Sequence, residues 1–377
     1  MIHIRAFPFT VLCIGILLFI VFLNTSTPSY LTHYSSDLLQ KYRPVAPVHA
    51  SSDISNSTLG FQKIFAVGLP ERSDKRDALT LISSLTGFNI EWVDGVKGEA
   101  VSDKAVPYGA DRVKLWESNL GSWRGHMNAV RRIVEQNLTS ALIFEDDMDW
   151  DTRLKSQLVT FAAGSKFIQY SSTTPSNLVS PYGDNWDLLW LGHCGEVFPE
   201  TLDEYKSLSP SSPEIAHLSR KYIITSDPTV APPMHFKGFQ NATQNPYTRW
   251  VHISGGPICT FAYALSQQGA RKVLWDLSVD KLAGPFDNAL AGLCRWGRDS
   301  RRLGMRCISV TPGLFQHHKA RGWIGGDSDI QKVGSTKEDV REKGVTENVV
   351  WSARMNVREM LMGEKIRGQW DDEVGNK

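Results

Sequence analysis

The stretch ALIFEDDMDWD, residues 141–151, passes without a break from an apolar run into a cluster of carboxylates. The residues before Glu145 are aliphatic or aromatic, which is typical of a buried strand. In α/β proteins, ligands bind at the carboxyl ends of such strands. The position of Glu145, Asp146 and Asp147 directly after the apolar run therefore favours a functional cluster over an ordinary acidic loop.

The spacing of these acids excludes one kind of metal site and allows another. Asp147, Asp149 and Asp151 have the 1-3-5 spacing of an EF-hand, but Thr152 and Leu158 replace its required Gly and Glu. Carboxylates at a strand end can instead hold Mg²⁺ or Mn²⁺ against a diphosphate, although they can also serve metal-dependent hydrolysis. Asp149 and Asp151 match no required position, so we expect them to be solvated turn or helix-cap residues.

Strands and helices alternate along the chain. Expected strands cover residues 63–69, 90–93, 141–144, 187–191, 257–264 and 305–310, and expected helices cover 71–85 and 122–136, with a further helix capped by Ser266. This alternation predicts an α/β fold with a mostly parallel central sheet flanked by helices. We expect a charged, solvated stretch over residues 331–345 and a terminal amphipathic helix over 347–362.

The composition bounds the class of protein. The 377 residues carry a formal net charge of +1, and 41% of them are hydrophobic. That length and apolar content suit one large globular domain or two small ones. A nearly neutral balance argues against a dedicated nucleic-acid-binding protein, which usually carries a basic excess.

The N-terminal region predicts a membrane anchor. Residues 7–23 contain no charged side chain and follow Arg5, so they suit a short transmembrane signal anchor, with a cleaved signal peptide as the main alternative. The charge before the span predicts a cytosolic tail over residues 1–6 and a luminal remainder. Residues 24–60, rich in Ser, Thr, Pro and Asn, are expected to form a flexible stem. The protein is then a single-pass type II protein of the Golgi or endoplasmic reticulum membrane.

The cysteines outside the expected anchor allow disulfides but do not choose among them. Cys194, Cys259, Cys294 and Cys307 permit three full pairings, all of which stay open. Their spacing does not match a structural zinc site. Glycosylation sequons at Asn56, Asn137 and Asn241 give weak support to a luminal location.

Eight short motifs occur in order along residues 61–330. They are IFAVGLPERSDKRDAL, WVDGVKG, GSWRGHMNAVRRIVEQ, ALIFEDDMDW, WDLLWLGHCGE, FAYALSQQGARKVL, GPFDNAL and TPGLFQ…DSDI. Together they resemble glycosyltransferase family 25, which contains lipopolysaccharide-biosynthesis and procollagen galactosyltransferase-like enzymes. The resemblance implies a single Rossmann-like catalytic domain of GT-A type over 61–330. It also implies a nucleotide-sugar donor (often UDP-galactose), a divalent metal such as Mn²⁺ or Mg²⁺, and inversion at the sugar carbon.

The resemblance also assigns roles to the acidic triplet. Asp147 would be the direct metal ligand, Glu145 would lie near the ribose or the ion, and Asp146 would belong to the same donor-binding motif. The family's usual Ser-His pair before this strand is Gly125-His126 in this sequence. That departure leaves His126 with two interpretations, a satisfied core histidine or a site residue.

Other candidate residues follow the remaining strands. Arg72 and Arg76 come after the first strand, where they can meet a diphosphate or lie on an exposed helix start. Asp287 can be a helix N-cap or the base that faces the acceptor, and Glu196 is the rival base. His317 could complete a metal shell, although the pair that it forms with His318 is equally typical of a surface.

These observations predict a metal-dependent glycosyltransferase. It would move a sugar, with galactose expected, from a nucleoside-diphosphate donor to a hydroxyl of a glycan or glycoprotein acceptor. A luminal metal-dependent phosphoesterase and a non-catalytic binding module are the alternatives. The sequence leaves the donor, the acceptor and the linkage open.

Overall fold

The computed structural model describes residues 54–170, 173–238, 245–299, 302–330 and 336–371. The expected tail, anchor and most of the stem, residues 1–53, lie outside these ranges. None of the helices in the described part has the length and apolar content needed to cross a bilayer. Residues 54–60 are folded, contrary to their expected place in a flexible stem. Leu59 is fully buried, and its carbonyl accepts a hydrogen bond from the Tyr182 hydroxyl at 2.5 Å.

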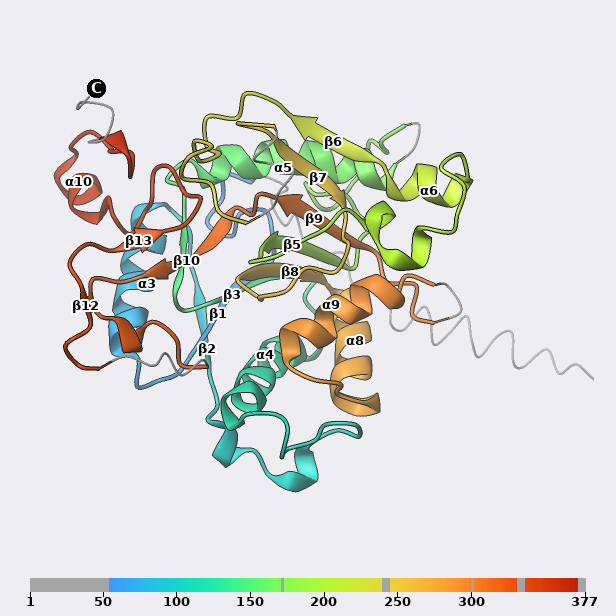
Figure 1. Cartoon of the computed structure of the whole chain (residues 1–377), viewed down its shortest axis with the longest axis horizontal. Coiled ribbons are helices and arrows are strands. Elements are labelled where there is room, and N and C mark those ends of the chain that lie inside the picture. The colour runs from blue at the N-terminus through green and yellow to red at the C-terminus, as the bar shows by residue number, and fades with distance from the viewer. Residues whose placement is uncertain (1–53, 171–172, 239–244, 300–301, 331–335, 372–377) are drawn as a thin grey trace, which may run out of the picture. The chain divides into compact units, whose positions relative to one another are not determined.

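An eight-stranded sheet forms the centre of this part of the chain (Figure 1). Its strands follow the order β2 (Glu91–Asp94), β1 (Lys63–Gly68), β3 (Ser140–Glu145), β8 (Ala262–Ser266), β5 (Leu188–Gly192), β9 (Cys307–Thr311), β7 (Arg249–Ile253) and β6 (Lys221–Ile224). Only β8 and β7 run antiparallel to both of their neighbours, so six of these eight strands point the same way. The mixed α/β fold with a mostly parallel sheet is confirmed.

Helices cover both faces of the sheet (Figure 1). They are α3 (Ser73–Leu85) and α5 (Leu154–Gln169) on one face and α4 (Glu117–Glu135), α8 (Gln267–Leu274) and α9 (Phe286–Trp296) on the other. The short helix α6 (Pro213–Leu218) precedes β6. Alternation within β1 shows the two faces, because Ile64 and Ala66 pack with the first set of helices and Phe65 and Val67 with the second. The centre of the sheet is thus packed between two apolar clusters.

Two predicted boundaries differ from the structure for local reasons. The expected strand over 257–264 begins only at Ala262, since Cys259 has a left-handed backbone (φ +66°) that no strand accommodates. Helix α4 begins at Glu117, ahead of the expected start at residue 122, and buries Leu120 in its first turn. The predicted cap of α8 is confirmed, because the Ser266 hydroxyl accepts a hydrogen bond from the Gly269 amide at 3.0 Å.

The C-terminal region forms small sheets rather than one helix. Strand β10 (Phe315–Lys319) pairs with β4 (Met148–Trp150) and with β13 (Val345–Thr346), and β11 (Gly322–Trp323) pairs with β12 (Val340–Arg341). The expected helix over 347–362 is wrong for most of its length, because α10 covers only Val357–Met362. The described part of the expected solvated stretch, residues 336–345, is mostly exposed and contributes only the short strand β12 and the first residue of β13.

The expectation that Asp149 is a solvated turn residue is also wrong. Its side chain has no exposed surface and accepts hydrogen bonds from the Thr346 hydroxyl at 2.6 Å, the Arg354 amide at 3.1 Å and the Ser352 hydroxyl. These donors come from the C-terminal segment, so a single carboxylate anchors that segment to β4. A buried carboxylate needs such partners because burying an unpaired charge is costly.

Asp151 is buried in the same way, with 1% of its surface exposed. Its carboxylate pairs with the Arg153 guanidinium at 2.7 Å and accepts a hydrogen bond from the Trp351 amide at 2.9 Å. It also accepts the Arg153 amide at 2.9 Å, directly ahead of helix α5. Asp151 thus lies two residues before the N-cap of α5, Arg153, so it is neither the expected cap nor solvated.

Asp149→Ala should strongly destabilise the fold. Each buried donor left without an acceptor costs about 1–3 kcal/mol, so we expect the free energy of unfolding to fall by about 3 kcal/mol or more in denaturant titrations. Asp203→Ala is the matched control, since Asp203 is exposed and forms a surface pair with Lys206. That variant should keep a free energy of unfolding close to that of the wild type. Equal losses in the two variants would contradict the anchoring role of Asp149.

Candidate functional site

Two cavities meet at the acidic triplet. The larger, of about 960 Å³, lies along the carboxyl ends of β5 and β9 and the start of α9. The smaller, of about 320 Å³, lies beyond the carboxyl ends of β1 and β2 against the first turns of α4. Glu145 and Asp147 line both cavities. The carboxyl end of β3 thus lies between two cavities that share Glu145 and Asp147 as lining residues, as expected for ligands bound at strand ends.

One ammonium group compensates the crowded carboxylates. The Nζ atom of Lys75 lies 3.0 Å from Asp147 Oδ2, 2.8 Å from Asp329 Oδ2 and 3.4 Å from Asp146 Oδ1. Lys75 is only 8% exposed and comes from the first turn of α3, which follows β1 at the same sheet edge. Lys75 and Asp329 were not among the site residues predicted from the sequence. In the sequence, Lys75 could have been chosen as a candidate because it lies between Arg72 and Arg76 at the start of an expected helix.

The pKa values of the two aspartates in the triplet are shifted in opposite directions. Burial, together with the neighbouring Asp147 charge, raises the pKa of Asp146 to about 7. Burial acts in the same direction on Asp147, but Lys75 and His317 outweigh it and hold the Asp147 pKa below its usual value. Asp147 is therefore the aspartate that carries a full negative charge at neutral pH.

Glu145 is held by residues from two other elements. Its Oε1 atom accepts a hydrogen bond from the Thr260 hydroxyl at 2.7 Å and lies 3.5 Å from His126 Nε2. The other ring nitrogen of His126 lies 3.0 Å from the Tyr263 hydroxyl, and the ring stacks on Phe286 with centroids 4.6 Å apart. His126 is therefore a buried core residue that also lies beside a residue of the site, so both interpretations of His126 apply.

The two predicted donor-binding arginines face other carboxylates. Arg72 pairs with Asp329 at 2.5 Å and with Asp74 at 2.8 Å. Arg76 pairs with Asp94 at 2.5 Å, and its guanidinium lies 4.6 Å from the centre of the Trp92 ring. Neither arginine is among the residues that line the two cavities. Their contact with a donor stays a prediction, while Lys75 is the α3 cation that reaches the triplet.

Asp147 and His317 have donor atoms suited to a divalent cation. Asp147 Oδ1 and His317 Nε2 are buried and make no hydrogen bond, and His317 Nε2 lies 3.5 Å from Asp147 Oδ2. Across the described ranges, no group of three or more His, Cys, Asp or Glu side chains is arranged to enclose a metal. Mg²⁺-like ions commonly take one or two protein ligands and complete their shell with phosphate and water. The pair fits that arrangement, whereas His318 instead lies 2.8 Å from the Thr346 hydroxyl.

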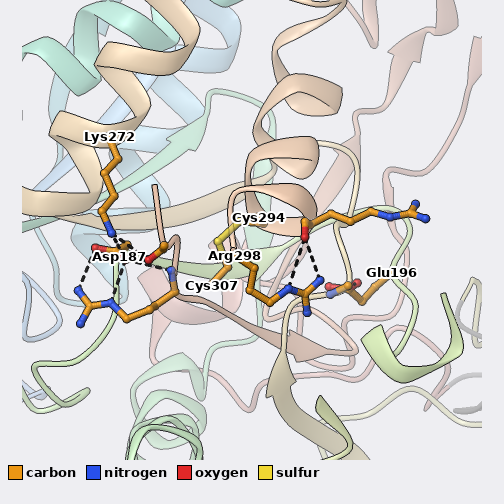
Figure 2. Close-up of a disulfide and its surroundings, with 10 residues drawn as sticks. Asp187, Glu196, Lys272, Cys294, Arg298 and Cys307 are labelled. Carbon is orange, nitrogen blue, oxygen red and sulfur yellow. Dashed lines mark hydrogen bonds and ion pairs between the residues drawn. A yellow bond between two sulfur atoms is a disulfide. The ribbon is translucent and has the colours of Figure 1, made fainter. Parts of the chain in front are cut away.

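The two candidate bases line the larger cavity in different environments. Asp287 is half-buried in the first turn of α9, and its Oδ2 atom accepts a hydrogen bond from the Cys259 amide at 3.1 Å. Glu196 is 9% exposed, and its Oε1 atom accepts the amides of Val197 at 3.0 Å and Gly255 at 3.1 Å. Burial raises the Glu196 pKa to about 8, although the Arg298 guanidinium beside it opposes the shift (Figure 2).

Of the three disulfide pairings that the sequence allows, the structure contains one. Cys194 pairs with Cys259 at the wall of the larger cavity, and both cysteines line that cavity. Cys294 pairs with Cys307 and joins α9 to β9 outside the lining of either cavity (Figure 2). The first bond therefore cross-links two segments that line the larger cavity, and the second cross-links a helix to a strand of the central sheet.

Comparison with known proteins finds a distant similarity to galactosyltransferases. No family model matches the chain. The chain is 22% identical to procollagen galactosyltransferase 1-B of Xenopus laevis over 344 residues. This aligned region covers 85% of this chain and 46% of that protein. It is 24% identical over 173 residues to procollagen galactosyltransferase 1 of Danio rerio, covering 42% of this chain and 26% of that protein. The chain thus spans less than half the length of these relatives. The similarity supports a relationship to glycosyltransferases.

Lys75→Met should destabilise the fold in a pH-dependent way. Removing one partner of a buried ionic group costs about 3–5 kcal/mol, because Asp146, Asp147 and Asp329 are left crowded without the ammonium. Protonation of these carboxylates relieves the repulsion, so the loss should shrink as the pH falls from 7.5 to 5. Denaturant titrations at both values measure it. Lys97→Met, which breaks an exposed pair with Glu71, is the control, and an equal loss at both pH values for Lys75→Met would contradict this account.

Glu196→Gln should make the fold less sensitive to alkaline pH. The folded-state pKa of about 8 lies above the ordinary value of 4.5, so the folded state binds the extra proton between these values. Stability of the wild type therefore falls as pH rises from about 5 to about 8, by about 1.4 kcal/mol for each unit of pKa difference. The variant should show a flatter profile in thermal unfolding between pH 5 and 9. Parallel profiles would show that Glu196 is ionised at neutral pH.

Proposed function

We propose that this protein is a metal-dependent inverting glycosyltransferase. It moves a sugar, with galactose expected, from a nucleoside-diphosphate sugar, with UDP expected, to a hydroxyl of a glycan or glycoprotein. The main support for the proposal is that Glu145 and Asp147 line both cavities. A transferase needs adjoining places for donor and acceptor, and a negatively charged wall suits a site that handles a metal and a diphosphate. The similarity to procollagen galactosyltransferases supports the same reaction class.

The smaller cavity suits the donor nucleotide. Gly68, Gly95, Gly98 and Gly121 are among the residues that line it and leave space there because they carry no side chain. A Cβ atom on Gly121 would lie 2.2 Å from the Val96 carbonyl oxygen, so the close approach of α4 to this loop requires glycine there. The space left at the sheet edge suits a flat ligand.

The diphosphate would lie at the triplet, between the two cavities. Lys75 supplies a fixed positive charge there, and Asp147 with His317 would hold Mn²⁺ or Mg²⁺. Such an ion, when bound, stabilises the charge that develops on a departing phosphate. Glu145 is kept in place by Thr260 and is positioned to contact the ribose or the ion. Asp147, charged at neutral pH, is the proposed direct ligand.

The larger cavity would receive the acceptor, with Asp287 as the proposed base. Asp287 takes the proton of the acceptor hydroxyl while that oxygen forms a bond to the anomeric carbon. The bond from the anomeric carbon to the diphosphate breaks in the same step, so the configuration inverts. Glu196 is less suited, because it is buried and already accepts two backbone amides. The proposed location, a Golgi or endoplasmic reticulum membrane reached through residues 7–23, rests on sequence alone.

Asp147→Asn should abolish metal-dependent transfer without unfolding the protein. The variant loses the charged oxygen that would hold the ion, and we expect transfer to fall by at least about 10²-fold, as when a charge-stabilising group is removed. Assays use purified protein with Mn²⁺, a panel of nucleotide sugars and acceptor glycans, and calorimetry of Mn²⁺ binding provides a second readout. Full activity in Asp147→Asn would refute the proposal.

Comparing two further variants tests the assignment of the base. Asp287→Asn should lower kcat by about 10²-fold or more, and Glu196→Gln should lower it much less. The reverse ranking would make Glu196 the base. Nucleotide-sugar breakdown that proceeds equally fast without any acceptor would indicate a phosphoesterase, and tight donor binding without turnover would indicate a binding module.

A further inference from the structure

One loop contacts Glu145, the proposed base Asp287 and the rival base Glu196. This loop, residues 254–261, connects β7 to β8. The Gly255 amide donates to Glu196 at 3.1 Å and the Cys259 amide donates to Asp287 at 3.1 Å. The Thr260 hydroxyl donates to Glu145 at 2.7 Å. Residues on the donor side and on the acceptor side are therefore held by the same few peptide units.

Besides the contact of Gly255 with Glu196, the loop is fixed to the segment after β5 by a disulfide and two backbone hydrogen bonds. The disulfide joins Cys194 to Cys259. The Cys194 amide donates to the Ile258 carbonyl at 3.1 Å, and the Ile258 amide donates to the Gly195 carbonyl at 3.1 Å. Cys259 itself has a left-handed backbone with φ +66°, which a residue with a Cβ atom adopts only when its surroundings impose it. That conformation turns the Cys259 amide toward Asp287.

We propose that the disulfide-bound loop 254–261 is a positioning element that sets Glu145 and Asp287 in a fixed relation to each other. Cys259 and Thr260 are then positioning residues, since they act through the two carboxylates. The inference rests on the proposed function for its effect on rate. Displacing a reacting group by about 1 Å can cost about 10²-fold in rate, so a loosened loop lowers kcat even when the fold persists.

The second disulfide provides a matched control. Cys294–Cys307 also joins elements near the site but belongs to neither cavity lining, and its cysteines make no part of the loop (Figure 2). Removing either bond relaxes a constraint on the unfolded chain and lowers stability. Only removal of Cys194–Cys259 should free the amide that holds Asp287. A general loss of stability and a loss of positioning are therefore separable.

The test compares Cys194→Ala/Cys259→Ala with Cys294→Ala/Cys307→Ala, at a temperature where both double variants remain folded. We expect the first to lower kcat at least tenfold and to change the pH profile of kcat/KM, with donor affinity within threefold of wild type. The second should keep wild-type kcat and pH profile while its melting temperature falls. Thr260→Val should also lower kcat at least fivefold, and Thr260→Ser should restore it to within twofold.

Hydrogen exchange makes the inference independent of activity. In Cys194→Ala/Cys259→Ala, the amides of residues 254–261 and the first turn of α9 should exchange at least tenfold faster, and those of the control variant should not. Wild-type kcat in the first double variant, equal losses of kcat in both, or unchanged exchange would overturn the positioning role. A wild-type protein that transfers no sugar would overturn the proposed function instead, and the exchange data would still decide the role of the loop.

Discussion

Three carboxylates share one ammonium group beside the central sheet, and the arrangement of the site depends on that contact. Asp146, Asp147 and Asp329 all lie within 3.4 Å of Lys75 Nζ. At such distances, away from bulk water, uncompensated repulsion would exceed the contribution of most single contacts to stability. The first turn of α3, the end of β3 and the loop that carries Asp329 must therefore stay together. That constraint fixes the positions of the carboxylates where the two cavities meet.

Much of the fold could be predicted because its signals are local. Apolar strands followed by helical spacing occur in order, and the start and composition of β1, α3 and β3 match their predictions closely. The departures come from tertiary context. Strand β8 starts late because the disulfide and the left-handed Cys259 keep the preceding residues in a loop. Its antiparallel insertion between β3 and β5 depends on the path of the chain, which periodicity does not encode.

The site was predictable where its residues adjoin a strand and unpredictable where they come from distant segments. Glu145 to Asp147 follow a buried strand directly, so their place at the sheet edge could be inferred. Lys75 and Asp329 are 254 residues apart in sequence, and only the folded chain brings them together. Asp149 looked solvated because its partners lie about two hundred residues later, in a segment that the sequence presented as a helix.

The anchoring of the C-terminal segment has a consequence for the order of folding during synthesis. Asp149 and Asp151 follow the acidic triplet, yet several of their hydrogen-bond donors come from residues 346–354. While the ribosome is still translating the central region, the sheet can assemble, but these two carboxylates still lack those donors. The strand that carries them can therefore become enclosed only after residue 354 has left the exit tunnel. Formation of the main sheet and enclosure of β4 would then be separate steps in the synthesis of the chain.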